Sequence, residues 1–344
     1  MMNTLYSAFA IISLSGAAAA APLPALNLDP DATTVSGLSS GAFMAVQLQV
    51  AYSGAIAGAG IVAGGPYDCA DQSIWRALNV CMDPFFFGAD PDRSLASMQA
   101  LAEEERIDPL EDIAADRLYL FHGLSDDTVD RSTMDALLQT YQSLGVTAEN
   151  LTYVTSVDAG HGFVTEQGQV SCDATRPDFL IDCDFDQAGD ILNRLYDDLS
   201  QPVSTTQQGL VTFDQATYTG GALGMDDTGF VYVPADCATG QTCRLHIALH
   251  GCKQGREYIG EGYARLTGFN PWAEANRIVV LYPQASRIPS PWYNWFAGNP
   301  NGCWDWWGYA GADYLSRDAP QLSAIARMAA ALGAPLAQSS ATPR

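Results

Sequence analysis

The chain has 344 residues, and its 39 acidic side chains outnumber 16 basic ones, which gives a formal charge of −23. A composition of 48% hydrophobic and 16% charged residues excludes a largely disordered chain and suits one large domain. A surface this acidic repels phosphate backbones and anionic lipids. We therefore expect a soluble protein that binds neither nucleic acid nor membranes.

The first 20 residues have the pattern of a secretory signal peptide. An apolar run at residues 4–14 is followed by Gly16, a run of alanines and Pro22. An apolar segment before small residues is typical of a cleaved signal, here with cleavage expected after Ala20. No Lys or Arg precedes the run, and the alternative is an ordinary buried helix. We expect a secreted protein, extracellular or periplasmic, with one domain at 21–344 and a frayed tail at 333–344.

The even number of cysteines indicates disulfides in an exported chain. Short loops favour Cys69–Cys81, Cys172–Cys183 and Cys237–Cys243, which leaves Cys252 and Cys303. Eight cysteines allow 105 pairings, so this connectivity stays a hypothesis. The chain has four histidines and no CxxC pair, so we expect no metal site and no cofactor.

Apolar strand-like and helix-like runs alternate along the chain. This alternation predicts an α/β fold with a mostly parallel central sheet flanked by helices. The polar stretch 201–208 is expected to connect two halves of one domain. The expected strands are residues 33–36, 59–63, 118–121, 151–157, 230–233, 245–249 and 278–282. The expected helices are residues 41–52, 95–105, 134–144, 188–199 and 321–331.

The segment Gly37-Leu38-Ser39-Ser40-Gly41 lies between an expected strand and an apolar helix. A strand–turn–helix context around G-x-S-x-G is typical of a nucleophile elbow, whose tight turn requires glycines on both sides of the serine. The pattern predicts Ser39 as a nucleophile. The alternative is a Gly-Ser turn that caps a helix.

A nucleophilic serine needs a base, and the base needs an orienting acid. Asp126 follows the expected strand 118–121 and is the predicted acid, with Asp127 as its rival. His161 lies between two glycines after the strand 151–157 and is the predicted base. The order Ser, Asp, His is that of α/β-hydrolases. His122 and His246 adjoin or lie in apolar strands, so we expect both to be packed and hydrogen-bonded.

His250-Gly251-Cys252 follows the expected strand 245–249. In α/β-hydrolases, an HG-type turn after a strand supplies a backbone N–H to the oxyanion hole, together with the residue after the nucleophile. That turn normally precedes the nucleophile in the chain, whereas here it follows Ser39. The order predicts a circularly permuted α/β-hydrolase. The alternative is an unrelated His-Gly turn.

Several motifs together resemble the polyhydroxybutyrate (PHB) depolymerases, and their order is similar to the type 2 catalytic domain. They are residues 37–41 (GLSSG), 63–69 (AGGPYDC), 249–252 (LHGC), 281–284 (LYPQ) and 301–309 (NGCWDWWGY). The resemblance covers residues 35–315 and implies a circularly permuted α/β-hydrolase. It implies the triad Ser39, Asp126 and His161, and an oxyanion hole from the N–H groups of Ser40 and Cys252. It also implies a Cys252–Cys303 disulfide.

Many extracellular members of that family add a linker and a polymer-binding domain, and neither follows here. We therefore expect attack on soluble oligomers, amorphous granules, or polymer adsorbed directly on the catalytic domain.

Five of the seven tryptophans lie within residues 292–307. Tryptophan offers a large apolar area and one N–H donor, which suits a neutral polyester chain rich in carbonyl groups. The expected substrate-binding residues are Trp304, Trp306, Trp307 and Tyr67, although some of these tryptophans could instead pack in a core. Phe85, Phe86 and Phe87 form a second candidate substrate-binding patch, although we expect them in the core.

The sequence thus predicts a secreted, monomeric serine esterase that hydrolyses PHB or related short-chain polyhydroxyalkanoates or their oligomers through an acyl-enzyme. The large negative charge further predicts a preference for neutral over anionic esters. The alternatives are a feruloyl or acetylxylan esterase, which would share the serine motif, and a non-catalytic polymer-binding protein.

Overall fold

The computed structural model describes residues 21–205, 209–292 and 297–336. The expected signal peptide, residues 1–20, and most of the tail 333–344 lie outside the described residues. No helix in the described ranges is long and apolar enough to cross a membrane.

The described residues form one large mixed sheet of eight strands, in the order β4-β3-β2-β1-β10-β11-β9-β8. The six strands from β4 to β11 pair in parallel, and the two strands at the other edge pair antiparallel. The strands are β1 (Leu28–Leu38), β2 (Ile56–Val62), β3 (Arg117–Phe121), β4 (Leu151–Val154), β8 (Leu210–Asp214), β9 (Thr228–Tyr232), β10 (Cys243–Leu249) and β11 (Ile278–Tyr282).

The first strand of the chain lies in the middle of this sheet. β1 pairs on one side with β2, its neighbour in sequence, and on the other with β10, which comes from the C-terminal half. The C-terminal half therefore supplies β8 to β11, the strands beyond β1. This arrangement is what circular permutation of a central-sheet hydrolase requires, so the predicted fold class is confirmed.

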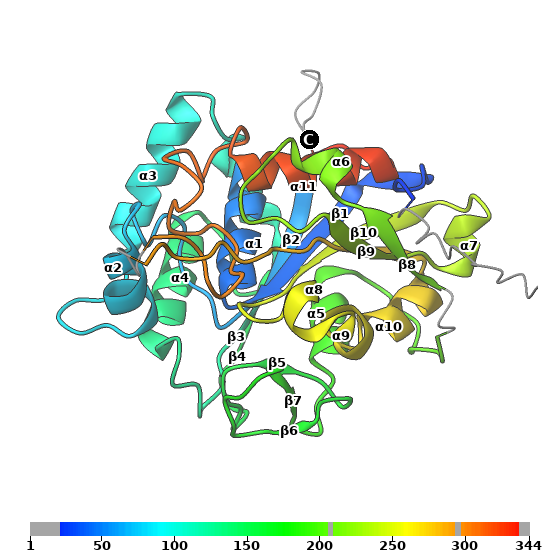
Figure 1. The fold of residues 1–344 in the computed structure, drawn as a ribbon, viewed down its shortest axis with the longest axis horizontal. Coiled ribbons are helices and arrows are strands. Elements are labelled where there is room, and N and C mark those ends of the chain that lie inside the picture. The colour runs from blue at the N-terminus through cyan, green and yellow to red at the C-terminus, as the bar shows by residue number, and fades with distance from the viewer. Residues whose placement is uncertain (1–20, 206–208, 293–296, 337–344) are drawn as a thin grey trace, which may run out of the picture.

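Helices cover both faces of the sheet, as Figure 1 shows for α11 and α10 on opposite sides of the strands. Side chains alternate between the two faces along each strand, since Leu118 and Leu120 enter one core and Tyr119 and Phe121 the other. One core includes α1 (Ser40–Ala51), α3 (Pro91–Glu103), α4 (Arg131–Ser143) and α11 (Pro320–Leu332). The opposite core includes α5 (Gln187–Leu195), α9 (Gly262–Leu266) and α10 (Phe269–Asn276).

The remaining elements are short, and some of them contribute residues to the two cores. A small sheet has the order β5-β7-β6 within the described residues. The sequence pattern missed this sheet and the edge strand β8, because their runs are too short or too polar to show a strand pattern. The short elements of the described residues are α2 (Ile74–Arg76), a π-helix (Ala77–Met82), a 3₁₀ helix (Leu110–Ala115), β5 (Phe163–Val164), β6 (Val170–Ser171), β7 (Leu180–Asp182), α6 (Ala216–Thr219), α7 (Ala235–Ala238) and α8 (Arg256–Ile259).

Two helices begin earlier than their apolar runs suggest, because aspartates cap them. Asp90 accepts hydrogen bonds from the backbone of Asp92 and Arg93, so α3 begins at Pro91 rather than at residue 95. Asp130 accepts one from the backbone of Ser132, so α4 begins at Arg131 rather than at residue 134.

The structure contains four disulfides, which join the same pairs that the sequence pattern favours. Three close short loops: Cys69–Cys81, Cys172–Cys183 and Cys237–Cys243. The fourth, Cys252–Cys303, links residues 51 positions apart and tethers the turn after β10 to the tryptophan-rich segment. Such disulfides are consistent with a protein that folds in an oxidising compartment.

Because the loop closed by Cys252–Cys303 is long, removal of this disulfide should cost more stability than removal of a disulfide that closes a short loop. Chain entropy gives about 4 kcal/mol for this disulfide and about 2 kcal/mol for Cys237–Cys243. We predict that the paired Cys→Ser variant at 252 and 303 loses stability and ester hydrolysis together.

The matched variant at 237 and 243, at the opposite end of β10, should lose less stability and keep its activity. Urea denaturation and a soluble-ester assay measure both quantities. Equal effects of the two disulfides on activity would contradict this prediction.

Candidate active site

The turn between β1 and α1 places Ser39 at the C-terminal edge of the sheet. Ser39 has φ 55° and ψ −120°, an uncommon backbone conformation for a residue other than glycine. A Cβ at Gly37 would lie 2.2 Å from the Gly41 oxygen, and a Cβ at Gly41 would lie 2.4 Å from the Leu249 oxygen. These close backbone contacts therefore require glycine at both positions, as the predicted nucleophile elbow does.

His161 and Asp126 come from the loops after β4 and β3 and meet in a hydrogen bond of 2.9 Å between Nδ1 and Oδ2. Both side chains are buried. Burial pushes the pKa of Asp126 upward, but the facing His161 and backbone N–H donors from Thr128 and Val129 outweigh it, so this pKa lies below its usual value. Asp126 is thus held as a carboxylate beside the imidazole.

The neighbouring Asp127 has a different partner. Its carboxylate accepts a hydrogen bond from the Thr175 hydroxyl, which in turn accepts one from the backbone N–H of His161. Asp126 rather than Asp127 therefore contacts the His161 ring. Within the described residues, Ser39 and His161 are not hydrogen-bonded to each other, although both line one pocket.

The other histidines are structural. His122 bonds to the Val129 carbonyl, and His246 lies between the hydroxyls of Thr34 and Ser36 at 2.8 Å each. Burial lowers the pKa of His246 to about 3, so its ring stays neutral. Both histidines are packed and hydrogen-bonded, as expected.

The turn after β10 lies against the elbow and is fixed by two buried polar side chains. The His250 ring donates from Nδ1 to the Gly251 carbonyl and accepts the Ala285 N–H at Nε2, and burial lowers its pKa to about 4. Gln254 accepts the Gly251 N–H and donates to the Asp178 and Phe179 carbonyls.

The backbone N–H groups of Ser40 and Cys252 make no hydrogen bond with another residue in the described parts of the chain. They therefore stay available to an oxygen atom of a ligand. Sequence reasoning missed the positioning roles of the His250 ring and Gln254. Only one signal could have indicated these roles, namely polar side chains in a tight turn after a buried strand.

A pocket of about 570 Å³ opens over these residues. Ser39, His161 and Cys252 line it together with many apolar side chains. Among the described residues there is no cluster of His, Cys, Asp and Glu that could hold a metal ion.

The tryptophan block divides between the pocket and the core. Trp306 and Trp307 line the pocket, and Trp306 stacks on Phe43 with ring centroids 4.1 Å apart. Trp304 and Tyr67 are fully buried, and they donate to the His250 and Leu315 carbonyls. The expectation that these two contact substrate is therefore wrong in this structure: they support the walls behind the pocket. Trp295 lies outside the described residues.

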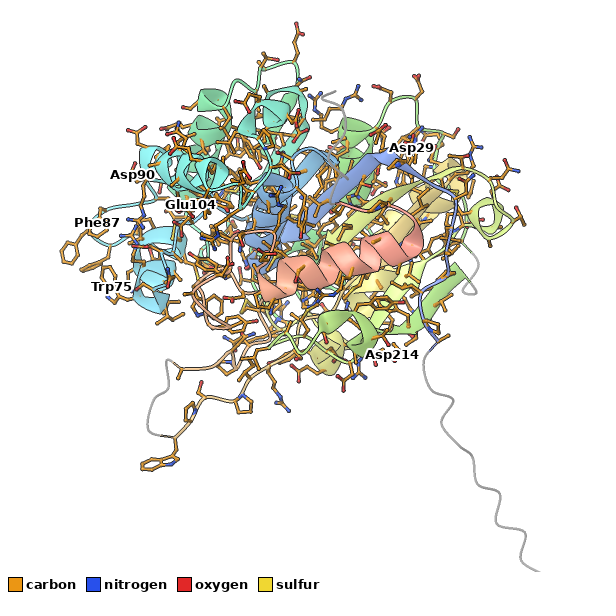
Figure 2. The ribbon with its side chains drawn as sticks, turned by 90° about the horizontal axis from the view of Figure 1, so that it is seen from above. Asp29, Trp75, Phe87, Asp90, Glu104 and Asp214 are labelled. Atoms are coloured by element: carbon orange, nitrogen blue, oxygen red, sulfur yellow. A yellow bond between two sulfur atoms is a disulfide. The ribbon has the colours of Figure 1, made fainter. Side chains whose placement is uncertain are left out.

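The three phenylalanines expected in the core are exposed instead. Phe85, Phe86 and Phe87 have 75%, 80% and 53% of their surface accessible. They follow the π-helix in a loop that no other layer covers, and Figure 2 shows Phe87 and Trp75 at the same outer end of the molecule. Leu78, also exposed, continues this apolar surface into the pocket wall.

The loop that carries Trp306 and Trp307 folds around a buried carboxylate. Asp305 accepts backbone hydrogen bonds from Gly308, Tyr309 and Ala310 at 2.8 to 3.0 Å. Burial raises the pKa of Asp305 to about 6, although these donors act in the opposite direction. Only an aspartate within an aromatic segment could have indicated this role.

The chain is similar over almost its whole length to two characterised proteins. It is 40% identical over 328 residues to the poly(3-hydroxybutyrate) depolymerase of Delftia acidovorans. It is 36% identical over 335 residues to the polyhydroxybutyrate depolymerase of Talaromyces funiculosus, and covers 96% of that protein. The chain belongs to the PHB depolymerase family. Each match covers 94% of this chain, and the chain spans 64% of the length of the Delftia protein.

Solved structures of the same family agree with the fold. The PHB depolymerase of Penicillium funiculosum superposes with a TM-score of 0.82 at 36% identity, over 91% of this chain and 99% of that one. A PHB depolymerase complexed with an R3HB trimer gives the same values. No family model matches the chain. The family resemblance inferred from the motifs is confirmed.

The raised pKa of Asp305 predicts how stability depends on pH. Between the unfolded pKa near 4 and the folded pKa of about 6, the folded protein binds more protons, so stability falls as pH rises. We predict that the wild type loses roughly 2 kcal/mol relative to Asp305→Asn between pH 4 and 7. Urea denaturation of both proteins at several pH values measures this difference. Parallel pH profiles would refute the prediction.

Proposed function

We propose that this protein is a secreted serine esterase that hydrolyses PHB or related short-chain polyhydroxyalkanoates and their oligomers. The observation that carries the proposal is that Ser39 shares one apolar pocket with a hydrogen-bonded His161–Asp126 pair. Family membership supports the same reaction class, the hydrolysis of carboxylic esters.

In the proposed mechanism, Ser39 attacks the ester carbonyl while His161 accepts its proton at Nε2. Asp126 holds the imidazole tautomer through Nδ1 and stabilises the imidazolium that forms. The N–H groups of Ser40 and Cys252 stabilise the oxyanion. His161 then protonates the leaving alcohol, and activates the water that releases the acyl group. The contact between Ser39 and His161 closes when substrate binds, since catalytic hydrogen bonds are often long without substrate.

The surroundings of the pocket favour a polymeric substrate with an apolar chain. Trp306 and Trp307 provide apolar walls, and the exposed Trp75 and Phe85–Phe87 extend the apolar surface outward from the pocket rim at Leu78. A soluble ester of one small acid would need only the pocket. A hydrophobic polyester chain would bury the outer surface as well.

Export and oligomeric state complete the proposal. Four disulfides are consistent with secretion, and we assign residues 1–20 as the cleaved signal peptide. The mature protein acts as a monomeric single domain in the extracellular or periplasmic space. N-terminal sequencing of the secreted protein tests the cleavage site.

The nucleophile is tested with two adjacent serines. We predict that Ser39→Ala abolishes hydrolysis of a soluble hydroxybutyrate ester and leaves the fold intact, because the Ser39 side chain faces the pocket. Ser40→Ala is the matched control and should have a milder effect, since it keeps the backbone N–H and removes only the 3.3 Å hydrogen bond that the Ser40 hydroxyl accepts from the Trp304 N–H. Residual activity of Ser39→Ala within about tenfold of wild type would sink the assignment.

The acid is tested with two adjacent aspartates. Asp126→Asn should lower kcat by roughly 10⁴-fold, as in a comparable triad change, because the imidazole loses its charged partner. Asp127→Asn should change kcat by about threefold or less, since its carboxylate contacts only Thr175. If Asp127→Asn proves the more damaging variant, the triad acid is misassigned.

The substrate is tested by direct comparison of polymers. We predict release of hydroxybutyrate from amorphous PHB by the wild type and not by Ser39→Ala. Ferulate and acetate release from esterified xylan serves as the comparison. Faster release from xylan than from the polyester would favour a plant-polysaccharide esterase.

A further inference from the structure

The only lysine in the chain lines the proposed active-site pocket. Lys253 stands alone among 344 residues, with every other basic side chain apart from histidine being arginine. It directly follows Cys252, whose N–H is a proposed oxyanion donor, and its side chain is exposed at the pocket. The position puts an exposed ammonium group at the pocket that Ser39 and Cys252 line.

Lys253 is also the only formally charged side chain among the described residues that line this pocket. The protein has 39 acidic residues, yet none of the described pocket-lining residues is one of them. The described side chains that line the pocket therefore carry one formal positive charge, whereas the whole chain carries −23 and the Asp126 carboxylate lies directly behind His161.

No carboxylate neutralises this ammonium in the described part of the structure. Two of the acidic groups on neighbouring segments have other partners, since Glu257 pairs with Arg287 and Asp226 with Arg256. Asp178, between the pocket-lining Pro177 and Phe179, forms no ion pair with Lys253 in the described residues, and its buried Oδ1 has no hydrogen-bond partner there. Asp126 faces His161, and Asp127 accepts from Thr175. An unpaired cation at the edge of an apolar pocket is able to bind an anionic group of a ligand.

The backbone beneath Lys253 is held in place. Its N–H donates to the Asn301 carbonyl at 2.7 Å, and the preceding residue is anchored by the Cys252–Cys303 disulfide. Gln254 on the other side is buried and hydrogen-bonded to Gly251. Only the lysine side chain is free to adjust to a ligand.

The chemistry of a hydroxyacid ester defines where the anion lies. Cleavage of the ester C–O bond leaves the hydroxyl-terminal part on the serine as acyl group, and the carboxyl-terminal part departs as the alcohol. The free carboxylate of an oligomer therefore always belongs to the leaving fragment. We propose that Lys253 binds this terminal carboxylate and directs cleavage to ester bonds near the acid end of the chain.

This inference rests on the proposed function and specifies its substrate class as acid-terminated oligomers. It opposes the preference for neutral esters that the overall charge of −23 predicts. Solvent ions screen the distant charges over about 8 Å, whereas the ammonium acts by direct contact. The local contact thus offsets the repulsion of the surface.

The test compares a hydroxybutyrate trimer with its methyl ester, which differ only in the terminal charge. We predict that Lys253→Met lowers the ratio of kcat/KM for the free acid to that for the methyl ester by about tenfold. Lys253→Arg should restore most of the ratio, and added salt should reduce it in the wild type. Arg277→Met is the control and should leave the ratio unchanged. It also removes a cation, but Arg277 directly precedes β11, at the end of the strand that lies away from the pocket.

An unchanged ratio in Lys253→Met would overturn the proposal, as would an equal loss for both substrates, which would make Lys253 a structural residue. A lower ratio in Arg277→Met would also overturn it, because overall charge would then explain the effect.

A binding measurement separates this proposal from the proposed function. Tryptophan fluorescence titration of Ser39→Ala with each trimer gives Kd without turnover. Weaker binding of the free acid, relative to the methyl ester, on adding Lys253→Met supports the carboxylate site even if the wild type cleaves neither trimer. In that case the esterase proposal fails and the binding site stands. The same relative affinity with and without Lys253 overturns the site itself.

Discussion

The close contact between the β1–α1 turn and the turn after β10 is the constraint on which the rest of the site depends. Gly41 lies directly against the carbonyls of Leu249 and His250, at distances that no side chain on Gly41 would permit. This contact exists because β1 and β10 are parallel neighbours at the centre of the sheet. It brings Ser39 and Cys252 to the same edge, although 213 residues separate them in the chain.

Parallel strands then supply the remaining groups at that edge. β3 and β4 end at the same side of the sheet as β1, so the loops that follow them deliver Asp126 and His161 to one another. The Cys252–Cys303 disulfide brings the tryptophan-rich loop over the same edge, and the buried Asp305 carboxylate organises that loop. The turn after β10 and the tryptophan-rich loop are thus joined by this disulfide and by the hydrogen bond from Trp304 to the His250 carbonyl.

Much of this arrangement could be predicted from the sequence. Strand-ending loops that carry Ser, Asp and His are local patterns, and the position of His250-Gly251 after Ser39 indicated the permutation. The fate of individual aromatic residues could not be predicted. Trp304 and Trp306 belong to the same tryptophan-rich segment, so the sequence does not distinguish them. Trp304 is buried behind the pocket, whereas Trp306 lines it. Phe85–Phe87 read as core residues, and they are exposed because no second layer covers their loop.

The central claim is that Ser39 is the nucleophile of the pocket, and covalent capture tests it most directly. The protein is treated with a fluorophosphonate ester, digested and mapped by mass spectrometry, with and without a hydroxybutyrate trimer present. We expect one phosphonylated residue, Ser39, and a loss of esterase activity in proportion to the labelling. The trimer should protect Ser39 from the reagent. Inactivation with Ser39 unmodified, or labelling of a different residue, would contradict it.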